Sequence, residues 1–158
     1  MAVGALDFDA EKTRDIIAAH RHLQGALLPT LRALQDAFGY VDERAEPLIA
    51  DVLNLTRAEV HGVVSFYHDF RRKPAGRHVV YLCRAEACQS AGGETLAAEA
   101  EAALGIASGE TTADGKTTLG AVYCLGLCAV APAAMIDGRP VGRLDAEHLD
   151  AILKEAQE

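Results

Sequence analysis

The stretch Leu119-Gly-Ala-Val-Tyr-Cys-Leu-Gly-Leu-Cys-Ala-Val-Ala-Pro132 decides the fold of this chain, because it places two cysteines directly after an apolar run. The run Thr117–Tyr123 starts with β-branched residues, a composition that predicts a buried strand. Cys124 and Cys128 follow this strand with three residues between them. We therefore expect both thiols on a short loop at the strand's end.

A second pair of cysteines occupies an equivalent place earlier in the chain. Cys83 and Cys88 have four residues between them and follow the apolar run His78–Leu82, which also predicts a strand. These are the only other cysteines, and 35 residues separate the two pairs. Two strand ends that each carry a pair of thiols indicate a metal centre.

The spacing of the cysteines leaves more than one metal centre open. A 2Fe–2S cluster takes four cysteines, two on each iron. Zinc also binds four thiolates, in pairs separated by two to four residues, so the spacing does not exclude it. Thioredoxin-type thiol exchange needs two residues between its cysteines, which neither pair has. We favour the cluster, since small residues in both loops allow backbone N–H groups close to sulfur: Ala85, Ala87, Gly126 and Ala129.

The composition of the 158-residue chain restricts its class. Half of the residues are apolar, as in soluble globular proteins, and no apolar run approaches the roughly 18 residues that a membrane span needs. The net charge of −8 argues against nucleic acid as a partner. The N-terminus lacks an export signal, so we expect a cytoplasmic protein, in which structural disulfides are disfavoured.

Hydrophobic periodicity divides the chain into two predicted domains, residues 1–76 and 77–158. For the first domain we expect a compact helical bundle that provides the main docking surface. Thr56 and Glu59 have the spacing of a capping box, which marks the start of a helix. The helices of this domain are expected at 9–22, 26–38, 45–53 and 56–64. In the second domain we expect strands at 79–82 and 117–123, with a loop at 83–89. We also expect a hairpin formed by 133–136 and 140–141, a helix at 94–104 and a last helix that begins at Asp145. This order is that of a thioredoxin-like domain, so the predicted class is α+β.

The sequence resembles the 24-kDa-type 2Fe–2S subunit of complex I from about Leu23 to its end. The resemblance lies in the four-cysteine motif and in segments of both halves: Leu28-Pro29, Phe38-Gly-Tyr-Val41, Val60–Phe70, Leu104-Gly-Ile106, Gly109–Gly115, Cys124–Ala129 and Ala131-Pro132. It implies a 2Fe–2S cluster held by Cys83, Cys88, Cys124 and Cys128, with one pair on each iron. It also implies a thioredoxin-like 2Fe–2S domain and a role in electron transfer.

Two segments make the resemblance more specific. Phe66-Tyr-His-Asp-Phe70 and Cys83-Arg-Ala-Glu-Ala-Cys88 are similar to the gamma subunit of soluble, molybdenum-dependent, NAD-linked formate dehydrogenases. That similarity implies a direct partner, the beta subunit that binds FMN and NAD, and a catalytic alpha subunit beyond it. FMN, NAD, further iron–sulfur clusters and the molybdenum cofactor would then lie in those partners. The diaphorase part of NAD-linked hydrogenases is the nearest alternative, followed by complex I.

The remaining polar residues do not suggest a catalytic site. Glu110, Thr111, Thr112 and Asp114 are expected to stabilise a turn, because no glycine-rich phosphate loop accompanies them. No Ser-His-Asp set and no acid–base pair stands out. We expect the chain to catalyse no reaction alone.

Overall fold

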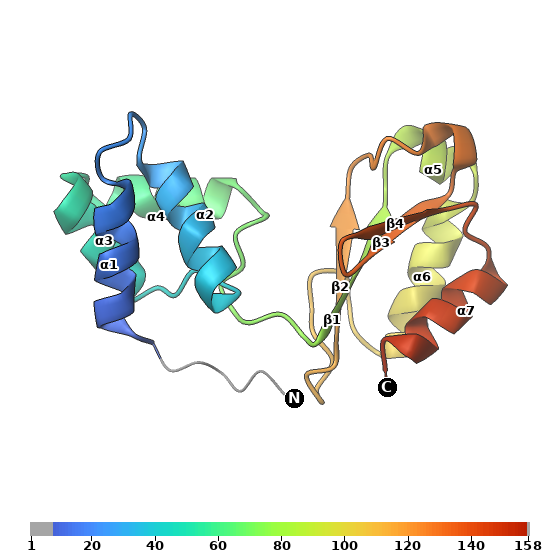
Figure 1. Ribbon diagram of the computed structural model, residues 1–158. Coiled ribbons are helices and arrows are strands. Elements are labelled where there is room, and N and C mark those ends of the chain that lie inside the picture. Colours follow the sequence, from blue (N-terminus) through green and yellow to red (C-terminus); the bar gives the residue numbers. More distant parts are fainter. Residues whose placement is uncertain (1–7, 158) are drawn as a thin grey trace. The chain divides into compact units, whose positions relative to one another are not determined.

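The structure is a computed structural model that describes residues 8–157. The chain forms two compact units, Met1–Pro74 and Ala75–Glu158, each with its own hydrophobic core (Figure 1). None of the helices in residues 8–157 is long and apolar enough to cross a membrane.

Within residues 8–74 the first unit contains four helices, and local signals fix several of their ends. Asp9 accepts a hydrogen bond from the Lys12 N–H at the start of the first helix, and Thr56 and Glu59 form the predicted capping box. Gly39, with φ 83°, ends the second helix in the left-handed conformation. The helices are α1 (Ala10–His20), α2 (Leu27–Phe38), α3 (Ala45–Leu53) and α4 (Arg57–Phe66).

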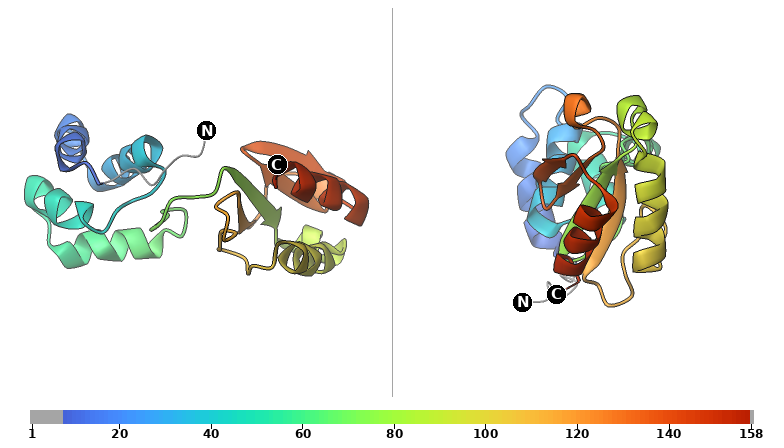
Figure 2. Two further views of the ribbon diagram at one scale, coloured as in Figure 1. Left: turned by 90° about the horizontal axis from the view of Figure 1, so that it is seen from below. Right: turned by 90° about the vertical axis from the view of Figure 1, so that its right-hand side faces the viewer.

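Apolar side chains from all four helices of this unit meet in one core. Ile17, Leu31, Ile49 and Val60 are completely buried in it, one from each helix. The left view of Figure 2 shows α1 to α4 from a second direction. The helix ranges agree with the predicted ones to within two residues at each end.

The second unit contains a mixed four-stranded sheet in the order β2-β1-β3-β4. Strand β1 runs parallel to β2, with His78 opposite Thr117 and Cys83 opposite Val122. The other neighbours, β1 with β3 and β3 with β4, are antiparallel. The strands are β1 (His78–Cys83), β2 (Thr117–Val122), β3 (Ala133–Ile136) and β4 (Arg139–Gly142).

Helices α6 (Gly93–Leu104) and α7 (Ala146–Glu155) cover the same face of this sheet (Figure 1). Val80 and Leu119 point from the sheet into the core that the helices close. The α+β class predicted from the sequence is confirmed. Two short elements were not predicted: helix α5 (Glu86–Ser90), where a loop was expected, and the 3₁₀ turn Cys128–Val130.

Candidate metal centre

The two cysteine loops begin at the same edge of the sheet. Cys83 is the last residue of β1 and lies opposite Val122, the last residue of β2. Because these neighbouring strands are parallel, the loops that follow them leave the sheet at the same carboxyl edge. Cys124 follows the end of β2 by two residues. Figure 1 shows α5 and the segment around Cys128–Val130 at this end of the unit.

The backbone of the second loop brings its two thiols together. Cys124 has φ 88°, a left-handed conformation that non-glycine residues rarely adopt, and Gly126 also lies in this region. The Sγ atoms of Cys124 and Cys128 are 3.6 Å apart, and the Gly126 N–H donates to Cys124 Sγ at 3.4 Å. Both cysteines of this pair are exposed to solvent.

The first pair is enclosed instead. Cys83 is only 4% exposed and Cys88, in α5, is 2% exposed. Apolar side chains of β2 and of both loops surround them, including Val122 and Leu125. Gly93 packs closely against the Cys88 backbone, because a Cβ atom at this position would lie 2.6 Å from the Cys88 carbonyl oxygen.

Hydrogen bonds to sulfur connect the two loops. Burial disfavours ionisation of Cys83, yet N–H groups of Ala85, Cys124 and Leu125, together with the Cys88 thiol, lower the pKa of the Cys83 thiol. Two of these N–H groups belong to the second loop. The second loop therefore lies close enough to the first for its backbone to interact with the Cys83 sulfur.

The pKa values of two other thiols, Cys88 and Cys128, are raised. Burial, followed by the neighbouring Cys83, raises the pKa of the Cys88 thiol. The hydrogen bond with Cys124, followed by its charge, raises the pKa of the Cys128 thiol. Two adjacent thiols resist becoming two adjacent thiolates unless a positive charge joins them, and a metal ion supplies that charge.

The spacing of the second pair fits a shared metal ion. Two thiolates on one tetrahedral metal, with metal–sulfur bonds of about 2.3 Å, lie about 3.8 Å apart. The observed separation of Cys124 and Cys128 is 3.6 Å. Among residues 8–157, no three Cys, His, Asp or Glu side chains converge on one metal position. The thiols are arranged as two pairs, and a 2Fe–2S cluster takes its ligands in this way.

Charged residues near the first loop are paired with one another. Arg84 donates from Nε to the Glu94 carboxylate at 2.9 Å and makes a second bond to it through Nη2. Glu94 belongs to α6, so this ion pair ties the loop to the helix behind it. Glu94 and Gly93 are supporting residues that the sequence did not single out, because both lie in a stretch predicted only as a helix start.

The acidic and hydroxyl residues of 110–114 form a turn, as predicted. Thr112 Oγ1 donates to Asp114 Oδ1 at 2.6 Å, and the same oxygen accepts from the Lys116 N–H. Thr111 and Thr118 exchange a hydrogen bond beside it. These contacts position the start of β2, the strand that leads to Cys124.

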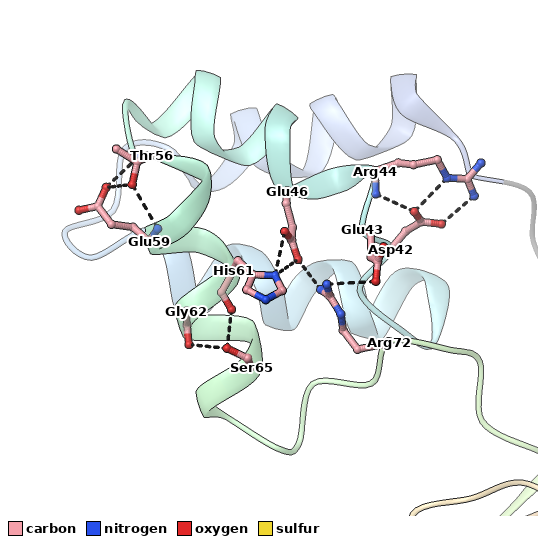
Figure 3. Close-up of polar contacts among 10 residues, drawn as sticks. All are labelled: Asp42, Glu43, Arg44, Glu46, Thr56, Glu59, His61, Gly62, Ser65 and Arg72. Atoms are coloured by element: carbon pink, nitrogen blue, oxygen red, sulfur yellow. Dashed lines mark hydrogen bonds and ion pairs between the residues drawn. The ribbon is translucent and has the colours of Figure 1, made fainter.

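A polar cluster in the helical unit escaped prediction entirely. Glu46 is almost buried in α3 and accepts a hydrogen bond from Arg72, while His61 Nδ1 lies 3.3 Å from its carboxylate (Figure 3). These residues are separated by 15 and 26 positions from Glu46, so no local pattern could have indicated the contacts.

Comparison with known proteins identifies a family. The family model described as thioredoxin-like [2Fe-2S] ferredoxin matches residues 13–157. The E subunit of the NADH-quinone oxidoreductase of Pseudomonas aeruginosa is 41% identical over 114 residues, which cover 72% of this chain and 69% of that protein. A homologous subunit of the Rhizobium meliloti NADH-quinone oxidoreductase, designated E 2, is 35% identical, over 91% of this chain and 86% of the relative.

Among solved structures, this chain is similar to part of an NAD+-reducing [NiFe]-hydrogenase in its air-oxidized state. The TM-score is 0.67 at 35% sequence identity, and the match covers 80% of this chain. It covers only 22% of the hydrogenase chain, so this chain corresponds to a part of that polypeptide. The matched relatives and neighbours are subunits or chains of oxidoreductases.

Proposed function

The chain belongs to the thioredoxin-like [2Fe-2S] ferredoxin family, and we propose that Cys83, Cys88, Cys124 and Cys128 hold its 2Fe–2S cluster. Each pair would bind one iron. The observation that carries this assignment is the meeting of two thiol pairs at one sheet edge, with N–H groups of the second loop directed at Cys83. The cofactor itself is the one that the family carries.

The residues around the thiols suit electron transfer. A bound 2Fe–2S cluster accepts and returns electrons one at a time. The apolar shell around Cys83 and Cys88 excludes water from one side of the site. N–H groups of Ala85, Leu125 and Gly126 stabilise negative charge on the sulfurs without supplying a proton. Their dipoles would therefore stabilise the additional negative charge of the reduced form.

We infer that the chain works as a non-catalytic electron-transfer subunit beside a partner that binds FMN and NAD. The matched relatives are subunits of NADH-quinone oxidoreductases, and the structural neighbour reduces NAD+. The flavin and nicotinamide sites would lie in the partner. Exposed Phe66 and Tyr67, at the end of α4, support docking through the helical unit. We expect the complex in the cytoplasm.

For the parent complex we propose an NAD-dependent formate dehydrogenase, with this chain as its gamma subunit. The support is the sequence of Phe66–Phe70 and of the Cys83–Cys88 loop. Its alpha subunit would carry the molybdenum cofactor and further iron–sulfur clusters. The second candidate is a hydrogenase diaphorase or complex I, and the names of the relatives favour it.

Affinity purification of the tagged chain from its native host separates these candidates. The purified complex is assayed for NAD+ reduction by formate and by hydrogen, and for NADH oxidation by a quinone. We expect formate-dependent NAD+ reduction and molybdenum in the sample. Reduction of NAD+ by hydrogen alone, with nickel present, would assign the chain to a hydrogenase, and quinone reduction alone would assign it to complex I.

A further inference from the structure

The two thiol pairs differ sharply in their access to solvent. Cys124 and Cys128 are exposed with their sulfurs 3.6 Å apart, whereas Cys83 and Cys88 are buried. We propose that Cys124 and Cys128 form a reversible disulfide whenever the chain meets a thiol oxidant before a metal occupies its site. The regulatory meaning of this disulfide, control over cluster loading, rests on the proposed function.

The loop geometry permits the bond. A disulfide needs its sulfurs about 2.05 Å apart, so the two Sγ atoms must approach by about 1.5 Å. Both side chains are exposed, and neither belongs to a buried cluster that would hold it in place. The three residues between them include Gly126, where even an added Cβ atom would meet no heavy atom within 4 Å, so the loop has room to adjust.

The chemistry balances with a disulfide oxidant such as oxidised glutathione. The thiolate of one exposed cysteine attacks a glutathione sulfur, the sulfur–sulfur bond breaks, and one glutathione leaves. The thiolate of the other cysteine then attacks the cysteine sulfur of this mixed disulfide. The Cys124–Cys128 bond forms and the second glutathione leaves as a thiolate. The two cysteines lose two electrons and two protons, and the oxidant becomes two thiols. A cellular dithiol reverses both steps.

The first pair cannot follow the same route. Attack requires the sulfur to reach the oxidant in line with its sulfur–sulfur bond, and Cys83 and Cys88 are only 4% and 2% exposed. The Cys88 backbone also packs directly against Gly93, which prevents it from turning outward. Oxidation should therefore be confined to one loop.

The disulfide would act on assembly of the cluster. It removes both proposed ligands of one iron and leaves the other pair unchanged. Oxidised chains would be held without a cluster until a dithiol restores Cys124 and Cys128, and they would be protected from sulfinic or sulfonic acid formation meanwhile.

Trypsin separates the cysteines in a way that makes the test direct. Cys83 lies in peptide 78–84, Cys88 in peptide 85–116, and Cys124 with Cys128 in peptide 117–143, because cleavage between Arg139 and Pro140 is blocked. The full chain is stripped of metal under reductant, treated with oxidised glutathione, alkylated with iodoacetamide at intervals and digested. Mass spectrometry follows each peptide.

We expect alkylation by iodoacetamide to decline more than about tenfold faster in peptide 117–143 than in the other two peptides. The unalkylated peptide 117–143 should be lighter by two hydrogens, the mass lost when a disulfide forms. Equal rates for all three peptides, cross-links between different peptides, or stable glutathione adducts on both exposed cysteines would overturn the proposal. The Cys128→Ser variant should keep a glutathione adduct on Cys124, because it has no partner for ring closure. A variant with Cys83→Ser and Cys88→Ser should still form the disulfide.

A second arm separates this inference from the function on which it rests. The chain loaded with iron and sulfide is exposed to the same oxidant. Slower label loss at Cys124 and Cys128 than in the stripped chain supports both ideas. Disulfide formation at an unchanged rate would overturn the assignment of these cysteines as ligands and the control of loading, while the disulfide itself would stand.

Discussion

The helical unit and the sheet unit use their buried polar groups in different ways. In the helical unit, the carboxylate of Glu46 is satisfied by Arg72 and His61, all from the same unit. In the sheet unit, Cys83 and Cys88 lie in a small apolar cluster apart from the main core, and burial, followed by the neighbouring Cys83, raises the pKa of the Cys88 thiol. The Glu46 carboxylate thus has its partners within its own unit, whereas the sheet unit has an edge suited to a metal centre.

The largest expected effect tests whether each core supports only its own unit. Ile49 is completely buried in the helical core and Leu149 is 2% exposed in the sheet core. Ile49→Ala and Leu149→Ala should each lower the free energy of unfolding by about 2–5 kcal/mol. Hydrogen exchange read by mass spectrometry should show faster exchange in the substituted unit alone. Equal acceleration in both units by either substitution would break the comparison.

The next effect concerns the support of the first cysteine pair. Gly93→Ala places a Cβ atom 2.6 Å from the Cys88 carbonyl oxygen, so α5 must shift. We expect a loss of about 1–3 kcal/mol in stability and a lower iron content per chain. Gly62→Ala in α4 is the matched control, because a Cβ atom added there would contact nothing outside its own helix within 4 Å. This substitution should raise the free energy of unfolding by about 0.5–1 kcal/mol. Normal iron content in Gly93→Ala would contradict this role.

A smaller effect tests the polar cluster of the helical unit. Arg72→Met leaves the Glu46 carboxylate, 11% exposed, without its guanidinium partner and should cost about 1–2 kcal/mol by chemical denaturation. Adding Glu46→Gln should recover most of this loss, since the buried charge is then gone. Arg32→Ala removes an exposed ion pair with Asp36 and should cost no more than about 0.5 kcal/mol. Equal losses of stability in Arg72→Met and Arg32→Ala would refute the distinction between a buried and an exposed ion pair.

An effect of similar size, confined to acid pH, is a pH dependence of the helical unit. Hydrogen bonds from the Arg44 side chain lower the pKa of Asp42 to about 2, against about 3.9 in an unfolded chain. The lowered pKa contributes about 1–2 kcal/mol of stability at neutral pH, which is lost as the pH falls from about 5 to about 2. Asp42→Asn should flatten this part of the acid-unfolding curve. An unchanged curve would show that the pair contributes nothing.

The sheet unit offers a counterpart to Asp42. Although burial opposes it, hydrogen bonds from His78 and from the Val79 N–H lower the pKa of Asp137. This contribution has the same sign, since it is present above the unfolded pKa and is lost on acidification. Asp137→Asn should therefore flatten the acid response of the sheet unit and leave that of the helical unit unchanged.

Local signals in the sequence were enough to predict most elements. The capping box of Thr56 and Glu59 and the turn before β2 each act over a few residues, and both appear as expected. Both cysteine pairs were also placed correctly at strand ends, because apolar runs identify buried strands. Parallel pairing of β1 and β2 then brings the pairs to one edge.

The features that were missed depend on contacts between distant residues or on very short elements. Helix α5 has five residues and no side-chain cap, so neither periodicity nor capping could indicate it. The bond between Arg72 and Glu46 spans 26 residues. The role of Gly93 follows from how closely α6 approaches Cys88, which only the packed structure shows.

The central claim is that four cysteines hold two bridged irons, and the metal content of the purified chain tests it most directly. Iron, acid-labile sulfide and zinc are quantified for the chain and for its Cys83→Ser and Cys124→Ser variants, together with visible absorbance. We predict about two irons and two sulfides per chain, with a bleached cluster and lower iron in both variants. One zinc and no sulfide per chain, or full iron, sulfide and absorbance in either variant, would contradict it.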